Sequence, residues 1–360
     1  MAQSHKGCKS CQNNEAMFIQ ETSTRAETPI AFIQAMIEAY QARGLDPSPA
    51  LEKAQIAPNL LSQKQARVTA LQMEWMSEAA MRELDDEALG WFRRRLPWGS
   101  YGMLARASVT APNLGVAMKR WCRHHNLLTD DVSLHLHTSD GLAHIELQEH
   151  PARHSLGRFR EFCTVSVLRN ALGVACWLTD SRITLSRTDL HFERPAHADS
   201  YRVLFDGPVQ FNAAAEPPLS RISFDAGYLS LPVRRDEAAL QRMLQRALLL
   251  TVRPYRRDRL LVEKVRQVLA EHVGQAHNAH EVAAHLGLST RTLHRQLKEE
   301  GSTLQQLKDS VRRERALALL LKTRKPIKQI AAEVGFANDK SFMRAFRLWT
   351  GKTVEEMRVS

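Results

Sequence analysis

Several features are scarce or missing in this sequence of 360 residues, and each absence narrows the class of protein. No run reaches eighteen consecutive apolar residues, which argues against a transmembrane helix and a membrane partner. The first 14 residues carry lysines and polar side chains but no apolar stretch, so they lack the pattern of a secretory signal. We therefore expect a cytoplasmic protein.

Cysteine is also scarce, with five residues in the chain. An odd number at wide spacing argues against a framework of disulfides. Cys8 and Cys11 stand at the spacing of half a zinc site, but no second pair follows at zinc-finger spacing. We interpret both as residues of a disordered tail and expect no metal and no cofactor. Cys163 and Cys176 lie in apolar runs, so we expect them to be buried.

The charge of the chain is unevenly distributed. Residues 257–360 contain 20 Lys and Arg against 12 Asp and Glu, a net charge of +8. The whole chain carries +11, which leaves +3 for the other 256 residues. A basic end on a nearly neutral body indicates a module that binds a polyanion, attached to a module with another task.

The part before residue 236 combines helical and strand-like patterns. Residues 1–28 are polar and predict a disordered tail, and residues 29–235 predict an α+β domain. Apolar residues recur at helical spacing near residues 30–40, 64–84, 113–126 and 158–178. Alternating runs flank the Asp140-Gly141 turn, which is typical of a hairpin, and further strand-like runs cover 183–192, 201–211 and 221–231.

We found no catalytic constellation in this domain. His124, His125, His135 and His137 are interpreted as ordinary helix and hairpin residues rather than metal ligands. The larger aromatic side chains are expected in the core: Trp91, Trp98, Phe159, Phe162 and Trp177.

The rest of the chain predicts helices and turns only. Residues 236–256 predict a linker helix that ends near Pro254, and residues 257–360 an all-α domain. Within that domain one pattern occurs twice, 48 to 49 positions apart, over residues 279–300 and 326–350. Each copy has a short apolar helix, a glycine (Gly287 or Gly335) for a left-handed corner, and an N-cap for the next helix (Ser289 or Asn338). This pattern predicts two helix-turn-helix units.

The second helix of each copy has an inward apolar side and an outward basic side. Leu293 and Leu297, and Phe342 and Phe346, stand four residues apart and anchor the helices inward. Arginine is the best bidentate reader of guanine, while lysine mostly meets phosphate. Residues expected to face DNA are Arg291, His294, Arg295 and Lys298 in the first unit and Lys340, Met343, Arg344 and Arg347 in the second.

Residues 303–322 between the copies favour one uninterrupted helix. Twenty residues at 1.5 Å each span roughly 30 Å, close to one turn of B-DNA, so the two recognition helices are expected to enter successive major grooves.

These residues resemble a known family. Ile327-x-x-Ile330-Ala331-x-x-Val334-Gly335-Phe336, followed by Ser341-Phe342-x-Arg344-x-Phe346-Arg347-x-x-x-Gly351, resembles the DNA-binding domain of the AraC/XylS transcription regulators. The resemblance implies double-stranded DNA and RNA polymerase as partners. It also implies base contacts from Arg291, His294 and Arg295 in the first unit and from Lys340, Met343 and Arg344 in the second, with Asp339 at the mouth of the groove. Val354 and Met357 depart from the family, which usually has proline and an aromatic residue there.

The first domain also resembles a known class. Asp189-x-x-Phe192 through Pro195 and Tyr201-x-x-Leu204-Phe205-x-x-Pro208-Val209-x-Phe211 are similar to the arabinose-binding-like effector domain of ornithine- and arginine-utilisation-type regulators. The resemblance implies a small-molecule effector of unspecified identity and a metabolite-responsive activator that is not an enzyme. Two alternatives stay open: a ligand-independent regulator whose first domain forms a homodimer, and an enzyme fused to a DNA-binding domain.

Overall fold

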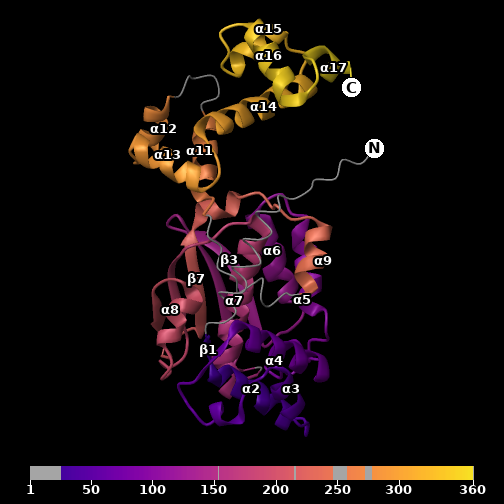
Figure 1. Ribbon diagram of the computed structural model, residues 1–360, viewed down its shortest axis with the longest axis vertical. Helices are drawn as coiled ribbons and strands as arrows, with labels where there is room; N and C mark the ends of the chain where they lie inside the picture. Colours follow the sequence, from indigo (N-terminus) through magenta and orange to yellow (C-terminus); the bar gives the residue numbers. More distant parts are fainter. Residues whose placement is uncertain (1–25, 153, 215, 246–257, 272–277, 360) are drawn as a thin grey trace. The chain divides into compact units, whose positions relative to one another are not determined.

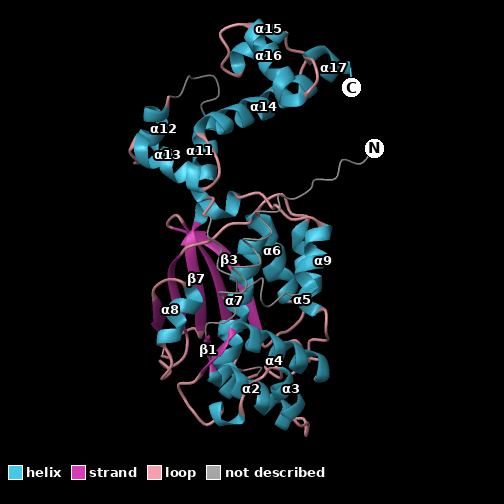
Figure 2. Ribbon diagram, in the orientation of Figure 1, coloured by secondary structure: helices cyan, strands magenta, loops and turns pink. Residues whose placement is uncertain are grey.

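The computed structural model describes residues 26–152, 154–214, 216–245, 258–271 and 278–359 (Figure 1). The chain forms two compact units, residues 1–256 and 257–360. The first unit mixes helices and strands, whereas the described part of the second is helical throughout (Figure 2). This confirms the predicted fold class. The expected tail with Cys8 and Cys11, and the last part of the expected linker helix, lie outside the described residues.

A five-stranded sheet lies at the centre of the first unit. Its strand order is β3-β4-β7-β5-β6, and all neighbours are antiparallel except β5 and β6. The predicted hairpin about Asp140-Gly141 is confirmed: Ser139 pairs with Leu142, and both turn residues have positive φ. The strands are β3 (Val132–Ser139), β4 (Leu142–Glu149), β5 (Leu185–Leu190), β6 (Val209–Phe211) and β7 (Leu219–Asp225).

The two faces of this sheet differ in polarity because side chains alternate along each strand. One face carries buried apolar residues such as Leu134, Ile145 and Ile222. Helix α6 (Leu114–His125) contacts β3 on the sheet, and helix α7 (Arg160–Thr179) contacts β4 and β7. The other face carries a row of charged and polar side chains, in which His137 stacks on His144 and Arg221 pairs with Asp189 at 2.9 Å.

Three helices form the wall beside the sheet: α5 (Ser100–Val109), α6 (Leu114–His125) and α7 (Arg160–Thr179). The Asn113 side chain accepts a hydrogen bond from Val116 N, which confirms the predicted start of α6. Helix α7 confirms the predicted helix over 158–178, and Cys163 and Cys176 on it are buried. Residues 157–179 are long and apolar enough to cross a membrane, but 83% of their most apolar window is buried inside the protein. This segment is therefore the core helix of the unit.

The first described residues form a smaller layer of helices around a two-stranded sheet. Strand β1 (Ala26–Pro29) pairs antiparallel with β2 (Arg67–Thr69). Residues 26–28 were expected in the disordered tail, and that expectation is wrong because their backbone pairs with a strand some 40 residues away. The helices of this layer are α2 (Ile30–Gln41), α3 (Ser48–Lys53), the 3-10 turn η1 (Pro58–Leu60) and α4 (Ala70–Glu83).

Two further sequence expectations are corrected. Residues 201–205 were expected to be strand-like, but they belong to α8 (Asp199–Phe205), which buries Tyr201 and Phe205 four residues apart on one side. Trp98 was expected in the core, but it is 45% exposed and its ring lies under the Arg82 guanidinium at 4.5 Å. Trp91, Phe162 and Trp177 are buried as predicted, and Phe159 is half-buried.

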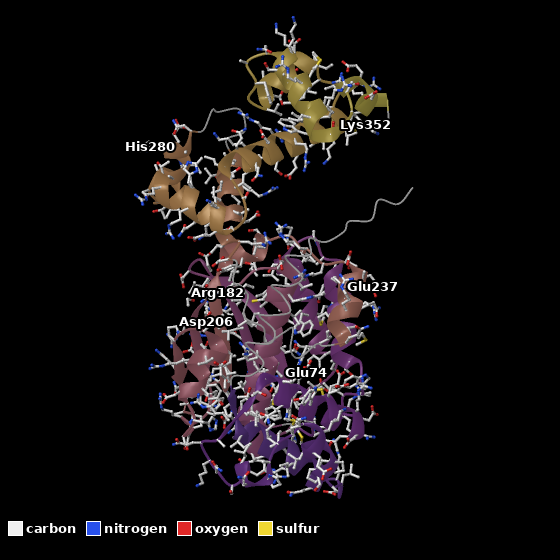
Figure 3. The ribbon with its side chains drawn as sticks, viewed as in Figure 1. Glu74, Arg182, Asp206, Glu237, His280 and Lys352 are labelled. Atoms are coloured by element: carbon white, nitrogen blue, oxygen red, sulfur yellow. The ribbon has the colours of Figure 1, made fainter. Side chains whose placement is uncertain are left out.

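The remaining short elements of the first unit are the 3-10 turns η2 (Gly157–Phe159) and η3 (Ala226–Ser230), and helix α9 (Glu237–Gln245). Figure 3 shows Arg182 beside Asp206, an ion pair between the start of β5 and the end of α8.

The second unit is built from seven helices in its described residues. Figure 3 labels His280 on the second of them and Lys352 just before the last. They are α11 (Leu260–Glu271), α12 (Ala279–His285), α13 (Thr290–Glu299), α14 (Leu304–Lys322), α15 (Ile327–Glu333), α16 (Asp339–Thr350) and α17 (Val354–Val359).

Two separate hydrophobic clusters hold these helices together. We define the first cluster as the buried residues of α11, α12 and α13 together with Leu304, Leu307 and Val311 of α14. The second cluster contains the buried residues of α15 and α16 together with Ala316, Leu319 and Leu320 of α14, Val334 and Val354. Helix α14 therefore supplies one end to each cluster.

Candidate nucleic-acid interface

The first helix-turn-helix is set by local hydrogen bonds. The Asn278 side chain accepts from Glu281 N at 2.9 Å, and the Glu281 carboxylate accepts from Asn278 N, which fixes the start of α12. Gly287 has a φ of 64°, so the chain leaves α12 in the left-handed conformation that glycine adopts at least cost. Ser289 Oγ accepts from Thr292 N at 3.1 Å and begins α13. Both predictions, the glycine corner and the cap, are confirmed.

The second helix-turn-helix repeats this construction. Gly335 has a φ of 82°, and Asn338 Oδ1 accepts from Ser341 N at 2.8 Å to begin α16. Gly351, also left-handed, ends that helix. The corner and the cap predicted for the second copy are therefore confirmed as well.

Each second helix turns one side to a cluster and the other to solvent. Leu293 and Leu297 of α13 are fully buried, as are Phe342 and Phe346 of α16. Positions 291, 294, 295 and 298 repeat at 340, 343, 344 and 347, a constant offset of 49 residues, and both sets lie on the side opposite the buried pairs. Seven of the eight residues expected to face DNA are exposed: Arg291, His294, Arg295, Lys298, Lys340, Arg344 and Arg347.

Met343 differs from the other seven. It is half-buried and packs against the second cluster. Its counterpart in the first helix-turn-helix, His294, is exposed. The outward sides of α13 and α16 therefore match in position but differ in chemistry. The His294 ring of α13 can form hydrogen bonds, whereas the Met343 side chain at the matching position of α16 is apolar.

Acidic side chains border both basic sides. Arg295 forms an ion pair with Glu299 one turn later, with Nη1 and Oε1 2.9 Å apart and both side chains exposed. Asp339 stands at the first position of α16, where a carboxylate complements the helix dipole.

Buried charges behind the interface have shifted pKa values. Glu300 caps the end of α13 and accepts from Val262 N in the first turn of α11 at 3.0 Å. Burial raises the pKa of Glu300 to about 7, although this hydrogen bond opposes the shift. Burial also lowers the pKa of Lys308 on α14, and the neighbouring Arg312 lowers it further.

Two arginines were not identified as functional from the sequence. Arg266 of α11 donates to both carboxylate oxygens of Glu314 on α14, at 2.9 and 2.7 Å. Arg312 of α14 lies over the Phe336 ring, 5.2 Å from its centroid, and donates to Gly335 O at 3.4 Å. Their partners lie 23 to 48 positions away, and only the basic character of Arg312 was visible in the sequence.

The histidines of the first unit, residues 1–256, differ in burial. His125 is fully buried, and neither of its ring nitrogens has a partner among the described residues. His135 and His137 are exposed on the hairpin, and His137 lies 3.5 Å from Glu146. Among the described residues, no group of three or more His, Cys, Asp and Glu is arranged to hold a metal ion.

Comparison with known protein families gives two matches along the chain. Residues 44–233 match the family model described as the arabinose-binding domain of AraC transcription regulator, N-terminal. Residues 282–360 match a helix-turn-helix domain. The first match alone covers more than half of the chain.

Two relatives and one solved structure are similar to this chain over different lengths. The ornithine utilization regulator of Pseudomonas aeruginosa is 28% identical over 334 residues, which cover 92% of this chain and 96% of the relative. The HTH-type transcriptional regulator VqsM of the same organism is 42% identical over 78 residues, or 22% of this chain and 24% of the relative. The crystal structure of the transcriptional regulator CdpR, also from Pseudomonas aeruginosa, aligns over 91% of this chain and 97% of its own, with 20% identity and a TM-score of 0.31.

Proposed function

This chain belongs to the AraC family of transcription regulators, and from that premise we propose that it is a metabolite-responsive activator whose two helix-turn-helix units recognise one DNA site. The duplicated basic surface carries this proposal. Two helices present side chains at matched positions, opposite buried pairs that fix each helix. A solvated basic helix is common in proteins, but two copies at one constant offset favour a repeating ligand such as the DNA duplex.

The outward residues divide into two roles in this proposal. Arg291, Arg295 and Arg344 read bases, because a guanidinium can donate two hydrogen bonds to guanine. Lys298 and Lys340 contact phosphates, which adds affinity without sequence preference. The remaining residues of the proposed surface border the groove: His294, Met343, Arg347 and Asp339.

The first unit is proposed to bind a small molecule and to bias the DNA-binding unit. Residues 44–233 match an effector-type domain, and the unit carries little of the net charge. Such a nearly neutral unit has no evident use in holding a polyanion. Effector binding would favour a conformer that presents both helix-turn-helix motifs to DNA and to RNA polymerase in the cytoplasm.

Arginine-to-alanine changes test the proposed readout. Starting from a site selected by the full-length protein, Arg295→Ala and Arg344→Ala should each weaken cognate binding by about 1–3 kcal/mol and relax preference at one base position. Lys298→Ala is the matched control and should weaken all sequences alike. The measurement is a binding selection on randomised duplexes for each variant.

The selection can also refute the proposal. An unchanged base preference in both arginine variants would mean that the readout lies elsewhere. Equal binding of the wild-type protein to random and selected duplexes would rule out specific recognition.

Linkage between effector and DNA tests the role of the first unit. If an effector favours the DNA-competent form, DNA must raise the effector affinity by the same factor, typically about 5- to 150-fold. A thermal-shift screen with ornithine and other amino acids, sugars and fatty acids would supply the ligand, and calorimetry with and without operator DNA would measure the factor. Equal affinities would exclude coupling, and a screen without hits would favour the alternative that this unit serves dimerisation.

A further inference from the structure

The middle of α14 belongs to neither hydrophobic cluster. The first cluster ends at Val311 and the second begins at Ala316. The residues between them, Arg312–Arg315, are all charged, and none is buried. We name this segment the polar waist of α14. Because α14 is the element that the two clusters share, the orientation of one helix-turn-helix relative to the other depends on α14 and on the side chains that hold each helix-turn-helix against it.

On the side of the first helix-turn-helix, Arg266 of α11 holds the polar waist of α14. Its guanidinium binds both oxygens of Glu314, and its Nη1 donates to Ser310 Oγ at 3.1 Å. Nη2 makes both bonds to Glu314 and Nη1 makes the bond to Ser310, so two nitrogens of Arg266 are held by two residues of α14. These bonds tie α14 to the helices of the first cluster.

On the side of the second helix-turn-helix, Arg312 makes the corresponding contact. Its guanidinium lies over the Phe336 ring and donates to the Gly335 carbonyl, in the corner between α15 and α16. The same Phe336 ring lies 5.7 Å from that of Phe342 and 5.8 Å from that of Trp349, both on the recognition helix α16. The position of the Phe336 ring, which Arg312 contacts, therefore bears directly on the position of α16.

We propose that Arg312 is a positioning residue that orients the second recognition helix relative to α14, and so determines which spacing between two half-sites the protein accepts. This inference rests on the proposed function, since it presupposes that both helices read one DNA site. It assigns to Arg312 a role in register rather than in contacting DNA.

A phosphate contact is the main alternative for a basic residue on this surface. Arg313, the next residue, is exposed and carries the same charge. Loss of a phosphate contact would weaken all DNA alike and reduce the salt dependence, whatever the spacing. Loss of a positioning contact would instead make the protein tolerant of altered spacing.

The test uses the full-length protein and duplexes that carry the selected site with its original spacer or with one or two base pairs inserted or deleted. We expect the wild type to prefer the original spacer. Arg312→Ala should bind that duplex about tenfold more weakly, in keeping with one lost cation–π contact and one charged hydrogen bond, and should bind the altered spacers nearly as well as the original. Arg313→Ala should keep the preference of the wild type.

Two further variants keep the result interpretable. Phe336→Leu removes the ring but retains an apolar side chain at the corner, and it should relax the spacing preference as Arg312→Ala does. Arg312→Lys retains the charge without the planar fork, and it should keep the salt dependence while losing spacing preference. Unchanged binding of each variant to a duplex with only the second half-site shows that the second helix-turn-helix is still folded.

The outcomes separate the two levels of inference. A wild type that discriminates between spacers, together with an Arg312→Ala variant that discriminates equally well, overturns the positioning role and leaves the proposed function standing. Equal losses for Arg312→Ala and Arg313→Ala at every spacing assign both residues to phosphate contact. A wild type without a selected site overturns the proposed function itself.

Discussion

Phe346→Ala is expected to lower the free energy of unfolding of the second helix-turn-helix by about 3–5 kcal/mol, as is usual when a buried phenylalanine is truncated. Phe346 is fully buried, and its ring centroid lies 5.7 Å from that of Phe342. The second cluster contains only nine buried residues, so it has few neighbours that can move into the cavity. Hydrogen exchange of α15 and α16 in the full-length protein would measure the loss, because opening of these helices exposes their amides.

Leu348→Ala is the matched control for this prediction. Leu348 lies on the same helix two residues later, but it is 86% exposed. Its truncation should therefore change stability by less than about 0.5 kcal/mol. If Phe346→Ala exchanged as slowly as the control, Phe346 would not be part of the core that fixes the recognition helix.

The second large effect concerns acid and the first unit. Burial lowers the pKa of His125 from its ordinary 6.5 to about 4, so the folded protein holds the ring neutral. Between pH 6.5 and pH 4, His125 binds a proton in the unfolded chain but not in the folded chain. The stabilisation is complete above pH 6.5 and is lost as the pH falls toward 4, by up to about 3 kcal/mol.

Denaturant unfolding at several pH values between 7 and 4 would measure this loss. His125→Asn keeps a polar side chain without a titrating ring, and it should flatten the profile in this range. His135→Asn removes an exposed histidine from the hairpin and should leave the profile as in the wild type. A wild-type stability that stays constant down to pH 5 would show that His125 is hydrated or paired in solution.

Features set by neighbouring residues were predictable from the sequence. The cap at Asn338, the left-handed Gly335 and the hairpin at Asp140-Gly141 each depend on a few consecutive residues, and each was found as predicted. The outward basic sides of α13 and α16 follow from helical periodicity once the buried residues are recognised. The exposure of seven of their eight residues was predictable for this reason, although their contacts with DNA stay a prediction.

Features that depend on distant partners were not predictable. Residues 26–28 look like a polar tail until β2 pairs with them. Tyr201 and Phe205 stand at helical spacing, but they lie in a segment that was predicted to be strand-like, and the structure buries both on one side of α8. The contact of Arg312 with Phe336 was not predictable, because Phe336 lies 24 positions away and is brought near by the packing of α14 against α15 and α16.

The ion pair between Arg295 and Glu299 has a consequence for how the protein finds its site. While the protein scans non-specific DNA, the Glu299 carboxylate offsets the charge of Arg295, so this turn of α13 adds little to the electrostatic attraction that slows sliding. If Arg295 reads a guanine, as proposed, its guanidinium exchanges the carboxylate for the base there, and leaving an exposed pair costs only about 0–1 kcal/mol. Glu299 would thus shorten the time spent on wrong sequences while taking little from the lifetime of the correct complex.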